Sequence, residues 1–238
     1  MAHRASTTNS GNSGTPSVNV PAGASADDIC TLKINFDRSS GTSTWPADFT
    51  ELATLRCTAE GQTTAVAWKR LTGSDAGTYD SSFTGGATDW VCQASLYSGR
   101  HLTDPPTHTT ATQNTGQSSP VTINGPSIDA LDGDDLEWCS GLDVSGNGIV
   151  TGPALQTVPS SPIAFTERVD TENAWANLCT GTADNVSAGT TGTLAGSVVL
   201  NAGTCGYNVF TIRIPVAASG TSYVLPITTP RMNPLVRM

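Results

Sequence analysis

Hydrophobic and polar residues alternate along several short stretches of this chain, and clusters of Gly, Ser, Thr and Asp separate these stretches. Alternation with a period of two is typical of β-strands that bury one face. The longest example covers residues 28–36. One of its faces would carry Cys30, Leu32, Ile34 and Phe36, and the other would carry Ile29, Thr31, Lys33 and Asn35. We expect a strand here whose second face lies in water.

Similar patterns continue to about Val216 and predict a series of strands. The expected strands cover Ser17–Val20, Thr50–Cys57, Thr63–Leu71, Thr78–Phe83, Trp90–Tyr97, Val121–Ile128, Leu136–Leu142, Ile163–Val169, Asn173–Cys179, Thr193–Leu200 and Gly206–Val216. Two polar segments, 99–118 and 144–161, are expected to be long loops. Many short strands joined by such turns predict an all-β chain, in which two antiparallel sheets pack as a β-sandwich.

The two ends of the chain differ from the part between them. Residues 1–16 are rich in Thr, Asn, Ser and Gly and have no periodicity, so we expect a flexible N-terminal arm. Residues 17–222 make up the expected β-sandwich domain. Residues 223–238 carry three prolines, which favour an extended C-terminal tail.

The C-terminal tail is apolar and basic as well as extended. A segment of this kind usually lies on another surface, either the body of its own chain or a neighbouring subunit. We favour the neighbouring subunit. The candidate partner-binding residues are Arg231, Met232, Leu235, Val236 and Arg237.

One short motif occurs twice. Residues 46–51 read Pro-Ala-Asp-Phe-Thr-Glu, and residues 162–167 read Pro-Ile-Ala-Phe-Thr-Glu. Each copy follows a polar loop and leads into an expected strand. The repeat indicates either pseudo-symmetry between two halves of the sandwich or a chance similarity.

The chain is acidic and contains few charged residues. Its 238 residues include 11 Lys and Arg against 20 Asp and Glu, which gives a net charge of −9. An acidic body repels the backbones of nucleic acids and anionic membrane surfaces, so neither is an expected partner. Arg4, Arg231 and Arg237 make the two ends basic. One interpretation is that these ends dock on an acidic partner, and the alternative is that the three arginines have no functional role.

The six cysteines include no CxxC pair, and no apolar run is long enough to cross a membrane. The first residues also lack the apolar core of a secretory signal. We therefore expect assembly in a cytoplasm with reduced thiols, although the even number of cysteines would also allow three disulfides.

Candidate catalytic groups are few. His101 and His108 lie near Asp104 in an expected loop, but no nucleophile and no third orienting group accompany them. The acidic residues Asp27, Asp28, Asp132, Asp134, Asp135 and Glu137 are expected to be solvated turn residues rather than a pair facing each other across a cleft. We expect no enzymatic activity, no catalytic residues and no cofactor.

A calcium site is the stronger of two weak binding candidates. Asp143, Ser145 and Asn147 present oxygen-bearing side chains at alternate positions before a glycine, like the first half of a calcium loop. The twelfth position of such a loop would be Ala154 instead of the usual glutamate. A simple Asn-Gly turn is the alternative. The second candidate is an exposed Trp or Tyr at the rim of the sandwich, which would stack on sugars.

Several motifs in order resemble the jelly-roll-like domains of tailed-phage virion proteins, many of which are minor tail proteins while others decorate heads. The motifs are Val20-Pro21-Ala22-Gly23 with Asp27-Asp28-Ile29, Trp45-Pro46 with Phe49, Trp68-Lys69-Arg70-Leu71, Ser74–Tyr79, Tyr97-Ser98-Gly99, and Pro162 with Phe165-Thr166-Glu167-Arg168. The resemblance extends from Pro21 to about Pro215, which is about 80% of the chain. The resemblance implies a jelly-roll-like β-sandwich and carries over no catalytic residue.

The resemblance also implies a place on the virion surface and partners among capsid or tail subunits. We expect a structural accessory protein, most simply a capsid decoration protein whose terminal segments hold it to its neighbours. One alternative is a minor tail protein or adhesin that binds host glycans or proteins. Another is a secreted carbohydrate-binding module. A homo-oligomer is compatible with each of them.

Overall fold

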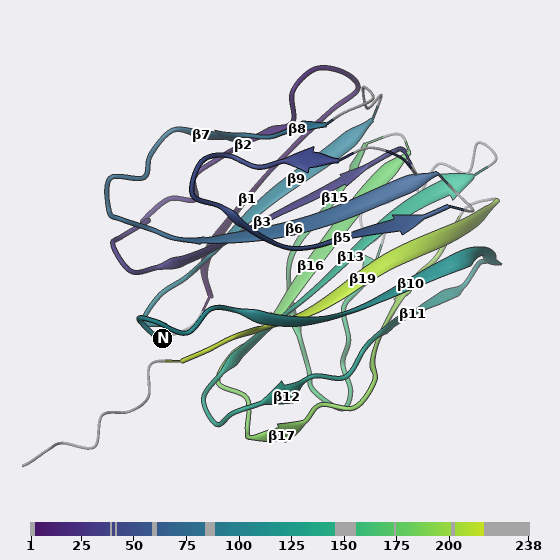
Figure 1. Cartoon of the computed structure of the whole chain (residues 1–238). Helices are drawn as coiled ribbons and strands as arrows, with labels where there is room; N and C mark the ends of the chain where they lie inside the picture. The colour runs from purple at the N-terminus through teal and green to yellow at the C-terminus, as the bar shows by residue number, and fades with distance from the viewer. Residues whose placement is uncertain are drawn as a thin grey trace, which may run out of the picture.

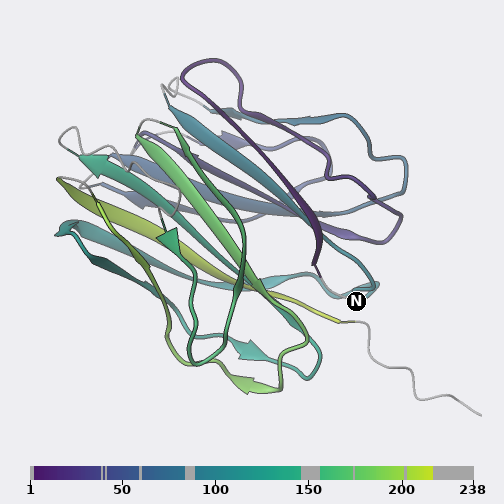
Figure 2. The same ribbon diagram turned by 180° about the vertical axis from the view of Figure 1, so that it is seen from behind.

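The structure is a computed structural model, and it describes residues 3–38, 40, 42–58, 61–83, 89–145, 156–173, 175–200 and 203–216. These residues form an all-β molecule, in which two five-stranded antiparallel sheets pack together (Figure 1). Figure 2 shows the same two layers from behind, with smaller groups of strands on their outer sides. The expectation of an all-β sandwich of two antiparallel sheets is confirmed.

The first large sheet has the order β1-β9-β3-β6-β5 and comes from the N-terminal half of the chain. Its strands are β1 (His3–Gly11), β9 (Trp90–Tyr97), β3 (Ile29–Phe36), β6 (Gln62–Arg70) and β5 (Thr50–Cys57). The second large sheet has the order β10-β19-β13-β16-β15 and comes from the C-terminal half. Its strands are β10 (Thr107–Ser118), β19 (Thr204–Ile214), β13 (Asp135–Ser145), β16 (Ala176–Ala183) and β15 (Thr166–Asn173).

Short strands cover the outer faces of the two large sheets. Beside the first sheet, β2 (Ser17–Asn19) pairs with β7 (Thr78–Asp80), and β4 (Ser43–Thr44) pairs with β8 (Ser82–Phe83). Beside the second sheet, β11 (Val121–Gly125), β18 (Leu194–Val198) and β14 (Gln156–Thr157) form a three-stranded sheet. One further pair joins β12 (Asp129–Ala130) to β17 (Gly189–Thr190).

The two halves of the chain share one strand order. Strands β1, β3, β5, β6 and β9 take the same places in the first sheet as β10, β13, β15, β16 and β19 take in the second. The short pair β2-β7 likewise corresponds to β11-β18, because each follows the first long strand of its half and lies over the large sheet. Residues 3–97 and 107–214 are therefore two structural repeats, which we call the first and second halves.

The repeated sequence motif lies at corresponding places in these halves. Residues 46–51 lead into β5, and residues 162–167 lead into β15. Both strands then shift register against their neighbour directly after the motif, between Glu51 and Ala53 in β5 and between Glu167 and Val169 in β15. Of the two interpretations left open by the sequence, pseudo-symmetry is the one that the structure supports.

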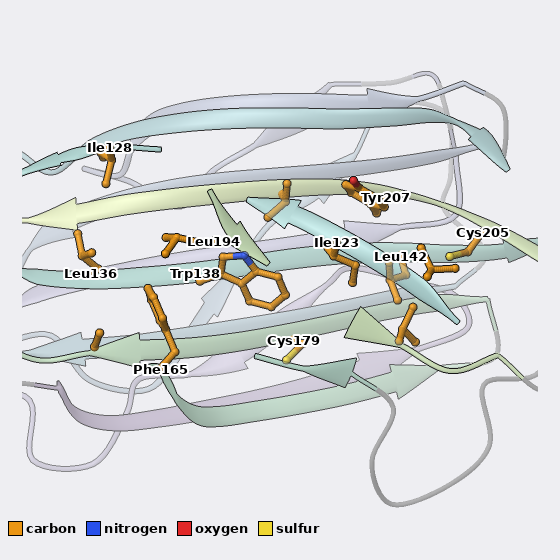
Figure 3. Close-up of a cluster of buried hydrophobic side chains, with 14 of the residues drawn as sticks. Ile123, Ile128, Leu136, Trp138, Leu142, Phe165, Cys179, Leu194, Cys205 and Tyr207 are labelled. Carbon is orange, nitrogen blue, oxygen red and sulfur yellow. The ribbon is translucent and has the colours of Figure 1, made fainter. Parts of the chain in front are cut away.

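Apolar side chains form a separate core on the outer face of each large sheet. In the first half, Leu32, Ile34 and Phe36 of β3 pack with Trp90 and Leu96 of β9. In the second half, the core surrounds Trp138 of β13. Figure 3 shows its indole among Ile123, Leu142, Phe165 and Leu194.

The glycines of β11 and β18 make room for this indole. A Cβ atom on Gly125 would lie 2.6 Å from Nε1 of Trp138, and one on Gly196 would lie 2.7 Å from the indole ring. Because real side chains do not approach so closely, both strands need glycine at these positions to lie over the tryptophan.

The outer strands of the two sheets lie against one another. Strand β1 packs beside β15, and strand β5 packs beside β10, so each edge of one sheet meets an edge of the other. Thr8 Oγ1 donates a hydrogen bond of 2.9 Å to Thr171 Oγ1 across the first junction. The main-chain N–H of Thr58 donates one of 3.1 Å to Asn114 Oδ1 across the second.

Two expectations about polar segments were wrong. The expected flexible arm contains β1, which pairs with β9 from His3 to Gly11, and the expected loop 99–118 contains β10, which pairs with β19. Both strands lie at sheet edges and are partly exposed on both faces, so they show little apolar alternation. Their threonines fit a pleated, half-buried surface once a neighbouring strand supplies the pairing.

Strand β3 also differs from expectation. Its second face was expected to lie in water, but all eight of its residues are buried. That face carries Thr31, Lys33 and Asn35 and packs against the second large sheet. The alternation therefore predicted the strand correctly but gave the wrong environment for its polar side.

The N-terminal strand provides a direct test of this fold. We expect the main-chain N–H groups of β1 that pair with β9 to exchange with deuterium much more slowly than those of an unstructured peptide, because their exchange needs local opening of the sheet. Exchange mass spectrometry on peptides covering residues 3–11 measures this. Random-coil rates throughout that segment would contradict the pairing.

Candidate functional site: the polar layer between the two sheets

Polar side chains gather where the two large sheets face each other. We call this group the polar layer; it consists of Thr31, Lys33, Asn35, Gln62, Thr64, Gln93 and Ser95 from the first sheet and Glu137, Thr180 and Asn208 from the second. All of these side chains are fully buried. Apolar residues such as Val66, Val91 and Phe210 fill the space around them. Burying so many polar groups is tolerable only if they are hydrogen-bonded.

A buried ion pair lies in this layer. Lys33 Nζ on β3 lies 2.9 Å from Glu137 Oε1 on β13, and neither side chain is exposed to solvent. The same ammonium donates hydrogen bonds to Ser95 Oγ at 2.7 Å and Thr31 Oγ1 at 3.1 Å. Lys33 thus has a partner for each of its three protons, which offsets much of the cost of removing its charge from water.

The other carboxylate oxygen of Glu137 accepts two hydroxyl protons. Thr31 Oγ1 donates to Oε2 at 2.8 Å, and the Tyr97 hydroxyl donates to the same oxygen. Burial raises the pKa of Tyr97 well above its usual value, and the charge of Glu137 adds to this effect, so the phenol keeps its proton. Tyr97 and Thr31 come from the first sheet, so these bonds also join the halves.

A chain of hydroxyl groups connects the ion pair with strand β1. Ser95 Oγ, which accepts from Lys33, lies 3.0 Å from Ser6 Oγ, and Ser6 Oγ lies 2.8 Å from Nε2 of His3. Burial lowers the pKa of His3 to about 4, and the positive charge of Arg168 adds to this effect. His3 is therefore neutral at physiological pH and acts here as a hydrogen-bonding group.

Amide side chains link the sheets in the rest of the layer. Asn35 Nδ2 donates to the main-chain oxygens of Leu142 and Asn177, at 2.8 and 2.9 Å. Its Oδ1 accepts from Thr64 Oγ1 at 2.7 Å. The sheets approach closely at this point, because a Cβ atom on Gly141 would lie 2.2 Å from Thr64 Oγ1.

A second buried ion pair ties the connection between the halves to the second sheet. Arg100, which follows β9, places Nη1 3.0 Å from Asp135 Oδ2, and both side chains are fully buried. Burial raises the pKa of Asp135 to about 6, although the N–H of Asn185 and the charge of Arg100 act in the opposite direction. The neighbouring Asp134 binds Arg213 and accepts the N–H of Val216 at 3.1 Å.

These buried groups are arranged for structure. The Lys33–Glu137 and Arg100–Asp135 pairs are closed off from solvent, so a dissolved substrate has no direct route to either of them. Burial also raises the pKa of Cys30 and Cys139 to about 12, which keeps both thiols protonated and poorly nucleophilic at neutral pH. The polar layer is best suited to hold the two sheets in one register.

The prediction that six acidic residues lie in solvated turns was wrong for four of them. Asp28, Asp134, Asp135 and Glu137 are buried, and only Asp27 and Asp132 of that set are exposed. Sequence reasoning missed Lys33 and Glu137 as a pair because they lie in different halves of the chain. The usable signal was that Lys33 is the only charged residue of β3, and Glu137 is the only one between Leu136 and Leu142.

The calcium candidates are only partly described. Asp143 and Ser145 lie in β13, where their backbones pair with β19 at Gly206 and Thr204, and Asn147 lies outside the described residues. In the described part of the chain, no three His, Cys, Asp or Glu side chains are grouped as a metal site would require. The calcium site therefore stays a prediction.

The residues of the expected tail contacts lie outside the part of the chain that the structure describes. They are Arg231, Met232, Leu235, Val236 and Arg237. At the other end, Arg4 is held within the molecule, because its Nη1 lies 2.9 Å from Asp28 Oδ2. Arg4 thus does not act as the free basic end that the sequence suggested.

The loop histidines play local roles. His101 Nδ1 lies 3.0 Å from the main-chain nitrogen of Asp104, whose N–H donates to it, and 3.4 Å from Oδ1 of the same residue. His108 lies in β10, and burial lowers its pKa. His101 lies near Asp104 as expected, whereas His108 lies in a strand instead of the expected loop.

Comparison with known proteins identifies no relatives: no family model matches the chain, and no curated protein and no solved structure is significantly similar to it. No helix in the described ranges is long and apolar enough to cross a membrane. Any assignment of function therefore rests on the sequence and on the geometry given above.

The buried ion pair is open to a mutational test. We expect Glu137→Leu to lower the free energy of unfolding by about 3–5 kcal/mol, because it leaves the Lys33 charge buried without a partner. The double variant Lys33→Met/Glu137→Leu should recover part of this loss. Denaturant unfolding of the single and double variants measures the coupling.

The exposed pair of Asp48 with Lys69 supplies the control. Asp48 is 80% exposed and lies 3.7 Å from Lys69, so Asp48→Asn should change the free energy of unfolding by less than about 1 kcal/mol. Equal losses for Glu137→Leu and Asp48→Asn would show that the buried pair has no special role.

Asp170 on β15 gives a pH-dependent prediction. Burial raises its pKa to about 6, against hydrogen bonds from the N–H of Gln156 and the side chain of Asn177 that lower it. The folded state therefore holds this proton more tightly than the unfolded state does. The resulting stabilisation is complete below the ordinary value of 3.8 and is lost as the pH rises through about 6.

Asp170→Asn should remove this contribution. We expect the free energy of unfolding to fall less steeply between pH 4 and 7 in the variant than in the wild type. Denaturant titrations at several pH values compare the two proteins. Parallel profiles would mean that Asp170 does not titrate in this range.

Proposed function

We propose that this chain is a non-enzymatic structural accessory protein of a tailed-phage virion, and that it decorates the outside of the capsid. One observation carries the proposal: the charged side chains of the interior pair with each other, Lys33 with Glu137 across the two sheets and Arg100, between the halves, with Asp135 of the second sheet. They serve to fix two halves as one rigid body. A rigid body of this kind suits a protein that covers a surface and binds other virion proteins.

We further propose that each half is a jelly-roll-like unit. In a jelly roll, eight strands wind into two facing sheets. The first half has β1-β9-β3-β6 on one side and the short pairs β2-β7 and β4-β8 on the other. The second half has β10-β19-β13-β16 opposite β11-β18-β14. Jelly rolls recur in viral capsid and lectin domains, which agrees with a place on a virion.

The sequence adds support of another kind. The acidic body favours a basic or neutral partner surface over nucleic acid or an anionic membrane. The motifs that resemble tailed-phage virion domains include residues 46–49 and 162–168, which now prove to lie at corresponding places in the two halves. The C-terminal tail supplies an apolar and basic segment for anchoring on a neighbouring subunit.

A head location is preferred to a tail adhesin for one reason. An adhesin was expected to offer exposed aromatic residues in the loops 38–45, 99–118 or 144–161. Trp45 instead packs on the apolar core of the first half, and its Nε1 donates a hydrogen bond of 2.8 Å to Glu51 Oε2. This aromatic ring is thereby turned toward the body of the protein.

Particle occupancy tests the proposal. We expect quantitative mass spectrometry of purified virions to find hundreds of copies per particle, whereas a tail protein would be present in only a few. Deletion of residues 224–238 should remove the protein from particles and leave its circular dichroism spectrum unchanged. Normal occupancy after the deletion would show that the tail is not the anchor, and absence of the protein from virions would overturn the proposal.

A further inference from the structure

The two halves can be compared residue by residue, starting from a matching turn. Asp28 and Asp134 precede β3 and β13, and each carboxylate accepts the main-chain N–H three residues before it, from Ser25 at 2.9 Å and from Leu131 at 2.7 Å. The residue before each aspartate has a positive φ, 67° at Asp27 and 85° at Gly133. These two turns fix the correspondence of β3 with β13.

Strand pairing extends the correspondence to β6 and β16. Lys69 on β6 pairs with Cys30, and Ala183 on β16 pairs with Leu136. Cys30 and Leu136 are the second residues of β3 and β13, at corresponding places after the matching turns. Lys69 in the first half therefore corresponds to Ala183 in the second.

The repeated motif supplies a second pair of corresponding residues. Phe49 and Phe165 occupy the same place in the motif, and the residues before them are Asp48 and Ala164. The threonines that follow, Thr50 and Thr166, pair with corresponding positions on β6 and β16. Asp48 therefore corresponds to Ala164.

The third pair lies in the loops after β6 and β16. The N–H groups of Leu71 and Val186 donate to Asp28 O and Asp134 O, each at 2.8 Å, so these two residues correspond. Gly77 and Gly192 follow them at equal spacing, and both have positive φ, 84° and 71°. Counting back two residues from these glycines pairs Asp75 with Thr190.

In the first half, the three residues form an ionic cluster. Lys69 Nζ lies 2.6 Å from Asp75 Oδ1 and 3.7 Å from Asp48 Oδ2. It also lies 6.0 Å from the centroid of the Phe49 ring. The largely buried side chains of Lys69 and Asp75 thus fill the space between the loop before β5 and the loop after β6, and the exposed carboxylate of Asp48 lies at its rim.

In the second half, the same space is open. Its counterparts Ala164, Ala183 and Thr190 are small and uncharged, and all three line a hollow of about 500 Å³ between residues 162–164 and 183–191. A hollow of this size lies in the range of small-molecule sites. Ala183 takes the place of Lys69, and Ala164 and Thr190 take the places of Asp48 and Asp75. The second half therefore lacks the ionic cluster of the first.

We propose that this hollow in the second half is a binding site for a neutral sugar residue. The inference does not depend on the proposed virion function. It rests on the corresponding positions of the two halves and on the groups that line the open space.

The lining favours a neutral, hydroxyl-rich ligand over a cation. The two carboxylates that hold an ammonium in the first half are absent here, and Asp184, which remains, lies 3.4 Å from the guanidinium of Arg168. The hydroxyl of Ser187 and the amide of Asn185 provide donors and acceptors, and Thr190 Oγ1, which donates its proton to Asp129, can still accept. Pro162 and Ile163 add apolar surface, which suits the C–H faces of a sugar ring.

A variant that rebuilds the ionic cluster is the sharpest test. Ala164→Asp/Ala183→Lys/Thr190→Asp places in the second half the three residues of the ionic cluster of the first. We expect at least one of glucose, galactose, mannose, N-acetylglucosamine and rhamnose to give a saturation-transfer NMR signal with the wild-type protein at millimolar concentrations. The signal should be lost in the rebuilt variant, while the circular dichroism spectrum stays unchanged.

A matched control introduces the same residues, two aspartates and one lysine, at other positions. Thr122→Asp/Asn124→Asp/Ala195→Lys places two aspartates and one lysine on exposed positions of β11 and β18, and it should keep the sugar signal. If the rebuilt variant does not fold, Ala188→Trp at the exposed rim of the hollow serves in its place.

Three results would overturn the site. These are the absence of a signal from every sugar, a signal that survives in the rebuilt or rim variant, and a signal from butylammonium in place of the sugars. The tests of virion occupancy use other readouts, so failure of the sugar site would leave the proposed function standing.

Discussion

The two large sheets of this protein meet over polar side chains, and every other feature depends on how those groups are paired. Lys33 and Glu137 come from different halves and are both withdrawn from water, so their partners must be in place for the sheets to close. Such a pair adds little net stability compared with an apolar contact, because desolvation costs about as much as attraction gains. Its main effect is to select one alignment of the first sheet on the second.

Because the two halves share one strand order, each residue of this ion pair has a corresponding position in the other half. By the correspondence of the halves, Glu137 takes the place of Thr31, and Cys139 takes the place of Lys33. The two charges of the pair therefore lie on opposite sides of the interface, and the corresponding positions, Cys139 and Thr31, carry no charge. Two identical halves would lack either the lysine or the glutamate of this pair, so the contact is specific between unlike halves.

The sequence predicts the central strands well, and the edge strands β1 and β10 and the interior chemistry poorly. Trp90–Tyr97 has the predicted bounds, because the apolar residues of this fully buried strand record burial directly. The edge strand Thr50–Cys57 also has the predicted bounds, since its Leu52, Ala53 and Leu55 pack on the apolar cluster between the sheets. Strands β1 and β10 escaped notice because threonine and glutamine side chains at a half-exposed edge give no periodic signal. The hollow between residues 162–164 and 183–191 was beyond prediction, since it depends on which side chains are missing compared with the other half.

The contacts between the edges of the two large sheets have a further consequence. Where β1 lies beside β15 and β5 beside β10, each edge is covered by a strand of the other sheet, which keeps it from pairing with another molecule. Along these described borders, two copies cannot join by extending each other's sheets. Under the proposed function, crowded copies on a shell would therefore stay separate.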